Sequence, residues 1–217
     1  MLQADNVVCK DQKTLLRTAA LRPGNGIFGP RGDLLIGLTL VRKFNPTWLA
    51  PTIQSFCYVE NVALAHLQLE RTLIDMPEVV GGEAYTICDD NPPVSYGDMD
   101  VAASTLTNGE TTFLQLPPAL LLLLAHIIEF YVHSRLKSPC ILGRLLPQLS
   151  GEIVNLQPSV FSLTLTHLIF DASRAMRDFE YRPAYTTIEG VCKTVAEFKA
   201  SGKKVEFRQT QLGAVTG

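Results

Sequence analysis

The stretch Ala20-Leu-Arg-Pro-Gly-Asn-Gly-Ile-Phe-Gly-Pro-Arg-Gly-Asp33 is dense in Gly and Pro and directly follows an apolar run. That run, residues 14–21, is short and mostly apolar, which is typical of an interior strand. Residues 22–33 have the composition of a loop. Ligands of an open α/β sheet bind beyond the carboxyl ends of its strands. The loop after Leu21 is therefore a candidate for part of a ligand site.

Strands and helices alternate beyond this loop. The predicted strands cover residues 14–21, 55–59 and 83–88. The predicted helices cover residues 34–43 and 62–73, and residues 44–54 are predicted to be irregular. Asn61 is placed to cap the second helix, and Ser95 with Asp98 has the spacing of a capping box. Thr186 and Glu189 form a second capping box before a terminal helix with an apolar stripe. This alternation predicts an α/β fold rather than a helical bundle.

The run from Ala119 to Val132 is apolar apart from His126 and Glu129. Its 14 residues are fewer than the roughly 20 that a membrane span needs. We expect a helix that forms the wall of a pocket, packs in the core, or lies at a membrane surface. Peripheral contact with the endoplasmic reticulum membrane is the favoured alternative.

The composition excludes several classes of protein. Hydrophobic residues make up 47% and charged residues 18% of the 217 residues, which does not fit a disordered chain. The net charge of −2 predicts no binding to nucleic acid, which requires a basic surface. The cysteines and histidines lack the spacing of a metal site, so no metal is predicted. The five cysteines are interpreted as reduced thiols of an intracellular protein.

Four blocks, in order, carry a resemblance to a known family. They are residues 20–33, residues 56–66 (FCYVENVALAH), residues 82–93 (GEAYTICDDNPP) and residues 171–183 (DASRAMRDFEYRP). They resemble the "LRP…I(F/Y)GP", "(Y)VxNVAxAH", "GxxYxI(T/S)DxxP" and "D.SKAxRDLGYxP" blocks of extended short-chain dehydrogenases of the 3β-hydroxysteroid dehydrogenase type. One block alone is weak, whereas four in order over roughly residues 1–200 are a strong signal.

The resemblance implies a fold and an activity. Residues 1–82 are expected to be the later strands and helices of an extended NAD(P)-binding Rossmann fold. Residues 83–200 are expected to form a small, mainly helical substrate-binding region, followed by a polar tail over residues 201–217. The implied reaction oxidises a ring hydroxyl of a sterol-like lipid and passes hydride to NAD or NADP. A cytoplasmic location or the surface of the endoplasmic reticulum is expected.

The same resemblance implies site residues. The main chain of the loop lies beside the nicotinamide in the family, so Pro23, Gly24 and Asn25 are the cofactor-binding candidates, with a plain tight turn as the alternative. Arg31 and Tyr58 are the substrate-binding candidates, although an exposed ion-pairing Arg and a packed Tyr are the favoured interpretations. Asn61 is interpreted as a helix cap, in preference to a brace behind the site.

Two motifs of such enzymes are not found in the sequence. The pattern Gly26-Ile-Phe-Gly-Pro-Arg-Gly32 matches a dinucleotide fingerprint by spelling, but Pro30 lacks the N–H that a phosphate turn donates. No lysine has a tyrosine four residues before it, so the Tyr/Lys pair that transfers the alcohol proton cannot be assigned. We therefore expect catalytic residues upstream of this stretch and an inactive chain. A short relative that binds a lipid, or pairs with a full-length enzyme as an oligomer, is the alternative.

Overall fold

The computed structural model describes residues 17–30, 36–89, 92–137, 158–159, 161 and 165–202. The strands are β1 (Ala20–Pro23), β2 (Ile27–Phe28), β3 (Phe44–Thr47), β4 (Ile53–Gln54), β5 (Cys57–Tyr58), β6 (Ala84–Ile87), β7 (Val94–Ser95) and β8 (Thr112–Gln115). The helices are α1 (Gly37–Val41), α2 (Val59–Asp75), α3 (Pro77–Val80), α4 (Tyr96–Leu106), α5 (Pro118–Lys137), α8 (Ser173–Asp178) and α9 (Thr187–Ala200). The predicted α/β class is confirmed.

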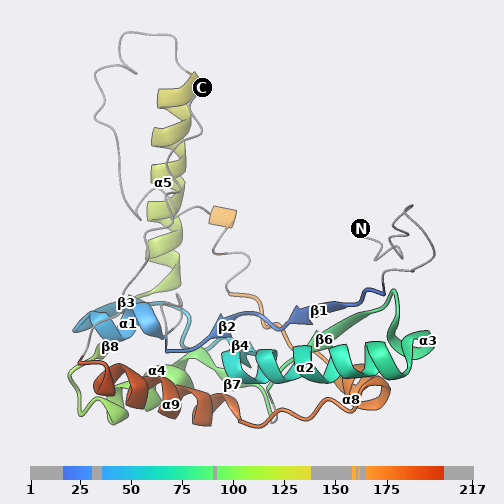
Figure 1. The fold of residues 1–217 in the computed structure, drawn as a ribbon. Helices are drawn as coiled ribbons and strands as arrows, with labels where there is room; N and C mark the ends of the chain where they lie inside the picture. The colour runs from blue at the N-terminus through green and yellow to red at the C-terminus, as the bar shows by residue number, and fades with distance from the viewer. Residues whose placement is uncertain are drawn as a thin grey trace.

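The strands form pairs between segments that are distant in the sequence. β1 pairs in parallel with β6, with Ala20 opposite Ala84 and Pro23 opposite Ile87. β2 pairs in parallel with β5, and β3 in parallel with β8. β4 and β7 are antiparallel. Figure 1 shows β1 and β2 following one another along one side of the molecule, above α2. Parallel pairing requires long crossover connections, which α2 and its neighbours supply.

Two clusters of buried side chains hold these layers together. One joins the β1–β6 pair to α2, α3 and α8, and includes Val62, Leu69, Ile87, Ala175 and Phe179. The other joins β2 and β5 to α1, α4 and α9, and includes Phe28, Phe56, Met99, Val191 and Phe198. β5 contributes to both clusters, because its two side chains point to opposite faces as they do in any strand. The junction of the two cores therefore lies at β5, beside the end of β1.

Both predicted capping boxes are confirmed. The Ser95 hydroxyl accepts from the backbone N–H of Asp98, whose carboxylate accepts from the Ser95 backbone N–H. Thr186 and Glu189 make the same reciprocal pair at the start of α9. The apolar stripe predicted for α9 holds for Val191, Val195 and Phe198, which are buried. The stripe was expected from the spacing of Ile188, Val191, Cys192, Val195 and Phe198, but Cys192 is exposed, so that part of the prediction is wrong.

Three predicted boundaries are also wrong. The first strand begins at Ala20 and runs into the predicted loop, which also contains β2. The segment predicted to be irregular contains β3 and β4, although it carries two prolines. Tertiary pairing overrides local propensity here, because each short strand finds a partner at least 30 residues away. The domain boundary at residue 82 stays a prediction.

Helix α5 is longer than the expected 14 residues, and it projects from the end of the molecule that holds α1 and β3 (Figure 1). One line of side chains along it is covered, with Ala125 at 0% and Ile128 at 7% exposure. A second line is polar and exposed, where His126 and Glu129 lie 3.7 Å apart. A third line is apolar and exposed, and it comprises Leu120, Leu123, Leu124, Ile127 and Phe130. We call this third line the α5 stripe. Within the described part of the chain, no helix is long and apolar enough to cross a membrane.

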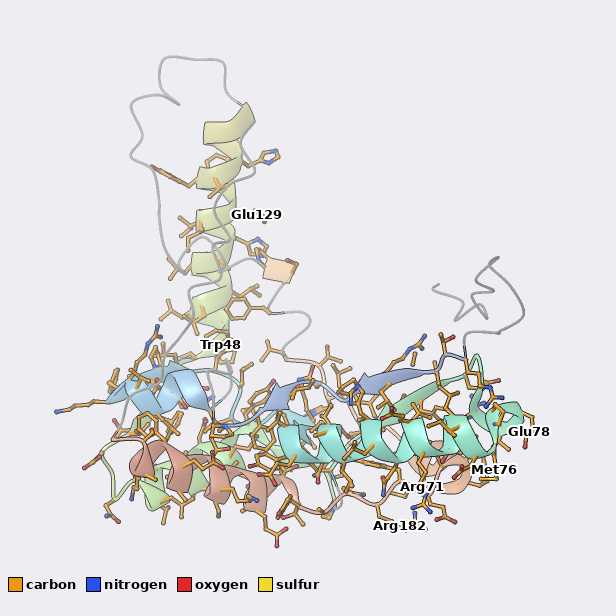
Figure 2. All side chains as sticks on the ribbon, in the orientation of Figure 1. Trp48, Arg71, Met76, Glu78, Glu129 and Arg182 are labelled. Carbon is orange, nitrogen blue, oxygen red and sulfur yellow. The ribbon has the colours of Figure 1, made fainter. Side chains whose placement is uncertain are left out.

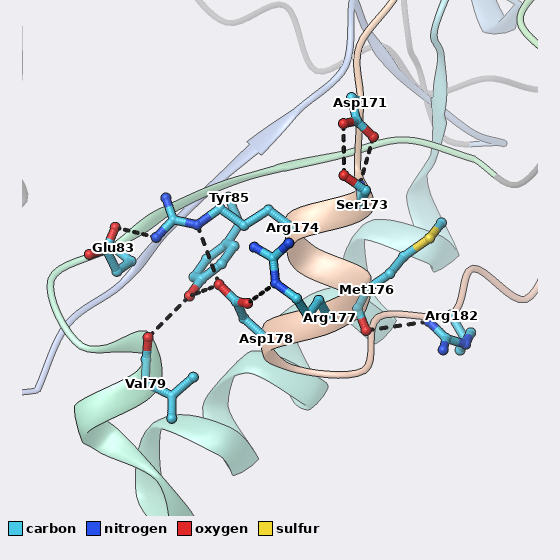
Figure 3. A network of polar contacts seen from close by, with 10 residues as sticks. All are labelled: Val79, Glu83, Tyr85, Asp171, Ser173, Arg174, Met176, Arg177, Asp178 and Arg182. Carbon is cyan, nitrogen blue, oxygen red and sulfur yellow. Dashed lines mark hydrogen bonds and ion pairs between the residues drawn. The ribbon is translucent and has the colours of Figure 1, made fainter.

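Helix α8 is fixed to β6 by a network of charged and aromatic side chains (Figure 3). The Arg174 guanidinium donates to Glu83 at 2.7 Å and to Asp178 at 3.3 Å, and lies 5.1 Å from the centre of the Tyr85 ring. The Tyr85 hydroxyl donates to Asp178 at 3.2 Å. At the start of α8 the Asp171 carboxylate accepts from the N–H and hydroxyl of Ser173. The contacts of Arg174 and Asp178 thus form a structural clamp at the amino end of β6, which we call the α8–β6 clamp.

Candidate functional site

The turn at the carboxyl end of β1 connects the two strand pairs. The Gly24 N–H donates to the Ile87 carbonyl at 2.8 Å, which continues the β1–β6 ladder by one residue. The Asn25 N–H then donates to the Ser55 carbonyl at 2.8 Å, on the chain that leads into β5. A Cβ atom on Gly24 would collide with the Ser55 carbonyl oxygen, so only glycine fits this crossing.

The Asn25 side chain is held by a chain of hydrogen bonds. Its Nδ2 donates to the Tyr96 hydroxyl at 3.1 Å, and that hydroxyl donates to Gln54 Oε1 at 3.0 Å. Gln54 Nε2 donates in turn to the Thr166 carbonyl at 3.2 Å. These residues come from the β1 turn, the start of α4, and β4. We call Asn25, Gln54 and Tyr96 the amide–tyrosine cluster.

Burial fixes the protonation state of this cluster. Gln54 is 1% exposed, and burial raises the pKa of the Tyr96 hydroxyl further above its ordinary value. The hydroxyl therefore keeps its proton and acts as a hydrogen-bond donor over the whole neutral range. Asp100 lies one helical turn beyond Tyr96, and burial raises its carboxyl pKa to about 7. The cluster can orient a polar ligand, but it contains no group that removes a proton from an alcohol at neutral pH.

The structure brings three of the predicted site residues together. Pro23, Gly24 and Asn25 form consecutive positions of the turn at the carboxyl end of β1, where ligands of such sheets bind. Arg31 lies outside the described residues. Tyr58 is fully buried and belongs to another group of side chains, because its ring packs against Phe28 and Tyr185. The substrate contact of Tyr58 stays a prediction.

The Tyr58 hydroxyl belongs to a polar clamp between α2 and α9. It donates to Glu60 Oε1 at 3.0 Å, and the Lys193 ammonium donates to the other oxygen of Glu60 at 2.9 Å. The Lys193 ammonium also lies 4.0 Å from the centre of the Tyr185 ring. Lys193 lowers the pKa of the Glu60 carboxyl, while burial raises that of Tyr58. Through these contacts the clamp joins the start of α2 to α9.

Asn61 is not a helix cap, which corrects the sequence interpretation. α2 begins at Val59, so Asn61 lies inside its first turn. Its Nδ2 donates to Asp89 Oδ1 and to the Tyr185 carbonyl, both at 2.7 Å. Its Oδ1 accepts from the N–H groups of Ala184 and Tyr185 at 2.8 and 3.1 Å. The residue instead acts as a brace, because it ties the chain before α9 to Asp89, two residues after β6, whereas a place behind a functional site stays a prediction.

Asp89 completes this brace from the segment that follows β6. Its carboxylate accepts from the Tyr58 N–H at 2.7 Å and from the Thr187 hydroxyl at 2.8 Å, besides Asn61. Burial raises the pKa of Asp89, although these three donors act in the opposite direction. A buried carboxylate with three donors is a fixed structural element.

Sequence reasoning missed Tyr96 and Gln54. Tyr96 directly follows the capping residue Ser95, so the start of the helix was visible, but nothing indicated that its hydroxyl reaches Asn25. Gln54 lies in a segment that was predicted to be irregular. Among the residues that the structure describes, no group of three or more His, Cys, Asp and Glu could hold a metal ion.

Comparison with solved structures shows that this chain shares the fold of Rossmann-type proteins. An epimerase from Methanothermobacter thermautotrophicus superposes with a TM-score of 0.56 at 14% identity, over 87% of this chain and 45% of that one. RMD from Pseudomonas aeruginosa, complexed with NADPH, superposes with a TM-score of 0.52 at 11% identity, over 85% of this chain and 48% of that one. The predicted Rossmann-type α/β fold is thereby confirmed.

Sequence comparison adds the family. The 3beta-hydroxysteroid-dehydrogenase/decarboxylase isoform 2 of Arabidopsis thaliana is 30% identical over 195 residues, 84% of this chain and 32% of that protein. The mouse sterol-4-alpha-carboxylate 3-dehydrogenase, decarboxylating, is 26% identical over 197 residues, 87% of this chain and 49% of that protein. The chain thus spans less than half the length of these relatives. A model of the 3-beta hydroxysteroid dehydrogenase/isomerase family matches residues 1–111. The chain therefore belongs to the 3-beta hydroxysteroid dehydrogenase/isomerase family.

Proposed function

We propose that this chain forms the nicotinamide end of the cofactor site and the sterol side of an NAD(P)-dependent dehydrogenase. The reaction is oxidation of a ring hydroxyl on a sterol-like lipid, with hydride passing to NAD or NADP. The observation that carries the proposal is the Gly24–Asn25 turn at the carboxyl end of β1, where backbone alone can approach a flat ring. The relatives named for sterol dehydrogenation support the substrate class.

The chain's own residues orient ligands in this proposal. The turn would lie against the nicotinamide, and Asn25 would offer a hydrogen-bonding group at its edge. The cofactor supplies the hydride acceptor when it is bound. Since no Tyr/Lys pair can be assigned within the sequence, we expect proton transfer to require residues that these 217 do not contain.

The test uses the single tryptophan, Trp48, which stacks on Phe161 at 5.1 Å near the base of α5 (Figure 2). Dehydroergosterol accepts energy from tryptophan, so sterol binding should quench Trp48 saturably, and an unlabelled sterol should reverse the quenching. The chain alone should produce no NADH or NADPH from a 3β-hydroxysterol. Absence of saturable energy transfer from Trp48 would refute sterol binding. Turnover by the isolated chain would refute the expectation that proton transfer requires residues outside these 217.

A second proposed function is contact with a membrane surface through the α5 stripe. Five apolar side chains at positions 120, 123, 124, 127 and 130 are 42% to 75% exposed along one line of the helix. An exposed apolar stripe of this kind can lie against the apolar part of the lipid interface. The endoplasmic reticulum surface is the proposed location.

Flotation with phosphatidylcholine and phosphatidylserine vesicles tests this contact. The Ile127→Glu/Phe130→Glu double variant should lose flotation, because both changes place charge in the stripe. Leu67→Glu is the matched control, since Leu67 is 65% exposed on α2 and should not affect flotation. Equal flotation of all three proteins would contradict a contact through α5, and resistance to carbonate extraction would indicate a span instead.

A further inference from the structure

We propose that Tyr96 is a positioning residue for the nicotinamide ring and that it acts through Asn25. This inference rests on the proposed function above. It assigns to Tyr96 the task of selecting which end of the Asn25 amide faces the ligand.

The Tyr96 ring is fixed before any ligand binds. Its backbone N–H donates to the Thr52 carbonyl at 3.1 Å, and its ring meets Phe56 edge-on, with centres 5.0 Å apart and planes at 86°. Phe56 is 1% exposed, so the aromatic pair belongs to the core. The position of the hydroxyl oxygen therefore follows from core packing and not from the site itself.

The direction of the hydrogen bonds follows from Gln54. Its Nε2 is engaged by the Thr166 carbonyl, so its Oε1 must face Tyr96 and accept the hydroxyl proton. The Tyr96 oxygen then has only lone pairs to offer to Asn25. Asn25 must present Nδ2 to it, which is the contact observed at 3.1 Å. The relay thus sets the orientation of an amide that would otherwise rotate between two states.

The selected orientation suits one kind of ligand group. With Nδ2 directed to Tyr96, Asn25 Oδ1 has no partner among the described residues and is left to accept a hydrogen bond. The Asn25 backbone is also fixed. Its N–H donates to the Ser55 carbonyl, and Gly24 already lies so close to that carbonyl that it cannot move toward it. The carboxamide of a nicotinamide ring carries an N–H2 donor that matches this acceptor.

The experiment uses the full 217-residue chain and reduced nicotinamide mononucleotide, which lacks the adenosine half. Binding is followed by energy transfer from Trp48 for the wild type, Tyr96→Phe, Asn25→Ala and the double variant. Tyr96→Phe keeps the ring on Phe56 and removes only the relay. Tyr85→Phe is the control, since it deletes the hydroxyl of a fully buried tyrosine in the network that joins α8 to β6 (Figure 3).

We expect Tyr96→Phe and Asn25→Ala each to weaken binding about fivefold, the factor for one ordinary hydrogen bond. The double variant should bind no more weakly than Asn25→Ala, and Tyr85→Phe should bind like the wild type. A Tyr96→Phe effect that persists in the Asn25→Ala background would overturn the relay, as would unchanged binding by a Tyr96→Phe protein. A wild type that binds no probe would refute the proposed function itself, and the role of Tyr96 with it.

Discussion

The Asn61→Ala substitution tests whether Asn61 is a helix cap or a buried brace, because the two roles predict different losses in the free energy of unfolding. A lost helix cap costs about 1 kcal/mol. The structure shows instead four hydrogen bonds from a side chain with 0% exposure, to Asp89, to Ala184 and twice to Tyr185. At about 1 kcal/mol for each buried hydrogen bond, Asn61→Ala should lower the free energy of unfolding by about 3–5 kcal/mol.

Urea unfolding followed by circular dichroism measures this difference. Asn61→Asp adds a second test, because it keeps the acceptor for the two N–H groups but places a carboxylate 2.7 Å from Asp89. Two carboxylates at that distance raise one another's pKa, so Asn61→Asp should be strongly destabilised at neutral pH and should partly recover in acid. A loss of only about 1 kcal/mol for Asn61→Ala, or no recovery of Asn61→Asp in acid, would refute the brace.

Three further predictions concern stability. Gly190→Ala should lower the free energy of unfolding by about 1–3 kcal/mol, because its Cβ would lie 2.7 Å from the Tyr58 ring. Ala196→Gly, at an exposed position of the same helix, measures in parallel thermal melts how much the difference in helix propensity between Ala and Gly contributes. Asp100 has a carboxyl pKa raised from 3.8 to about 7, so the folded state holds its proton more tightly than the unfolded state, and stability should fall between about pH 4 and 7. Asp100→Asn should make that fall shallower in urea midpoints, with the part due to Asp89 remaining, and parallel pH profiles of the two proteins would contradict it. Glu180 has a φ of 58°, in the left-handed region, and Glu180→Gly should raise stability by about 0.5–1 kcal/mol in the same urea assay, whereas a lower midpoint would argue against backbone strain.

The sequence predicted those features that depend on local signals. Two capping boxes require only a hydroxyl and a carboxylate three residues apart, and both occur as predicted. The turn at Pro23–Asn25 was predicted from its glycine and proline, and the structure explains the glycine by the close approach of the Ser55 carbonyl.

The features that were missed depend on distant partners. β3 could not be predicted from residues 44–47, because its stability comes from β8, with Phe44 opposite Thr112. Asn61 has the residue type of a cap, and only the positions of Asp89 and Tyr185 show that it is a brace. Tyr96 is an ordinary first residue of a helix until Asn25 and Gln54 are placed beside its hydroxyl. The roles of such residues depend on long-range contacts, which the periodicity of the sequence does not reveal.

The register of β1 with β6 also determines when this fold can form during synthesis. Among the described residues Ala20 pairs with Ala84, and this pair cannot form until Ala84, 64 residues later, has left the ribosome. At roughly 5–20 residues per second, this interval lasts about 3–13 s. During that time α2 can form from its own residues, whereas the edge of strand 20–23 that later pairs with β6 stays open to other nascent chains. Synthesis conditions that slow the ribosome between β1 and β6 should therefore lower the yield of folded protein more than slowing it after Ile87.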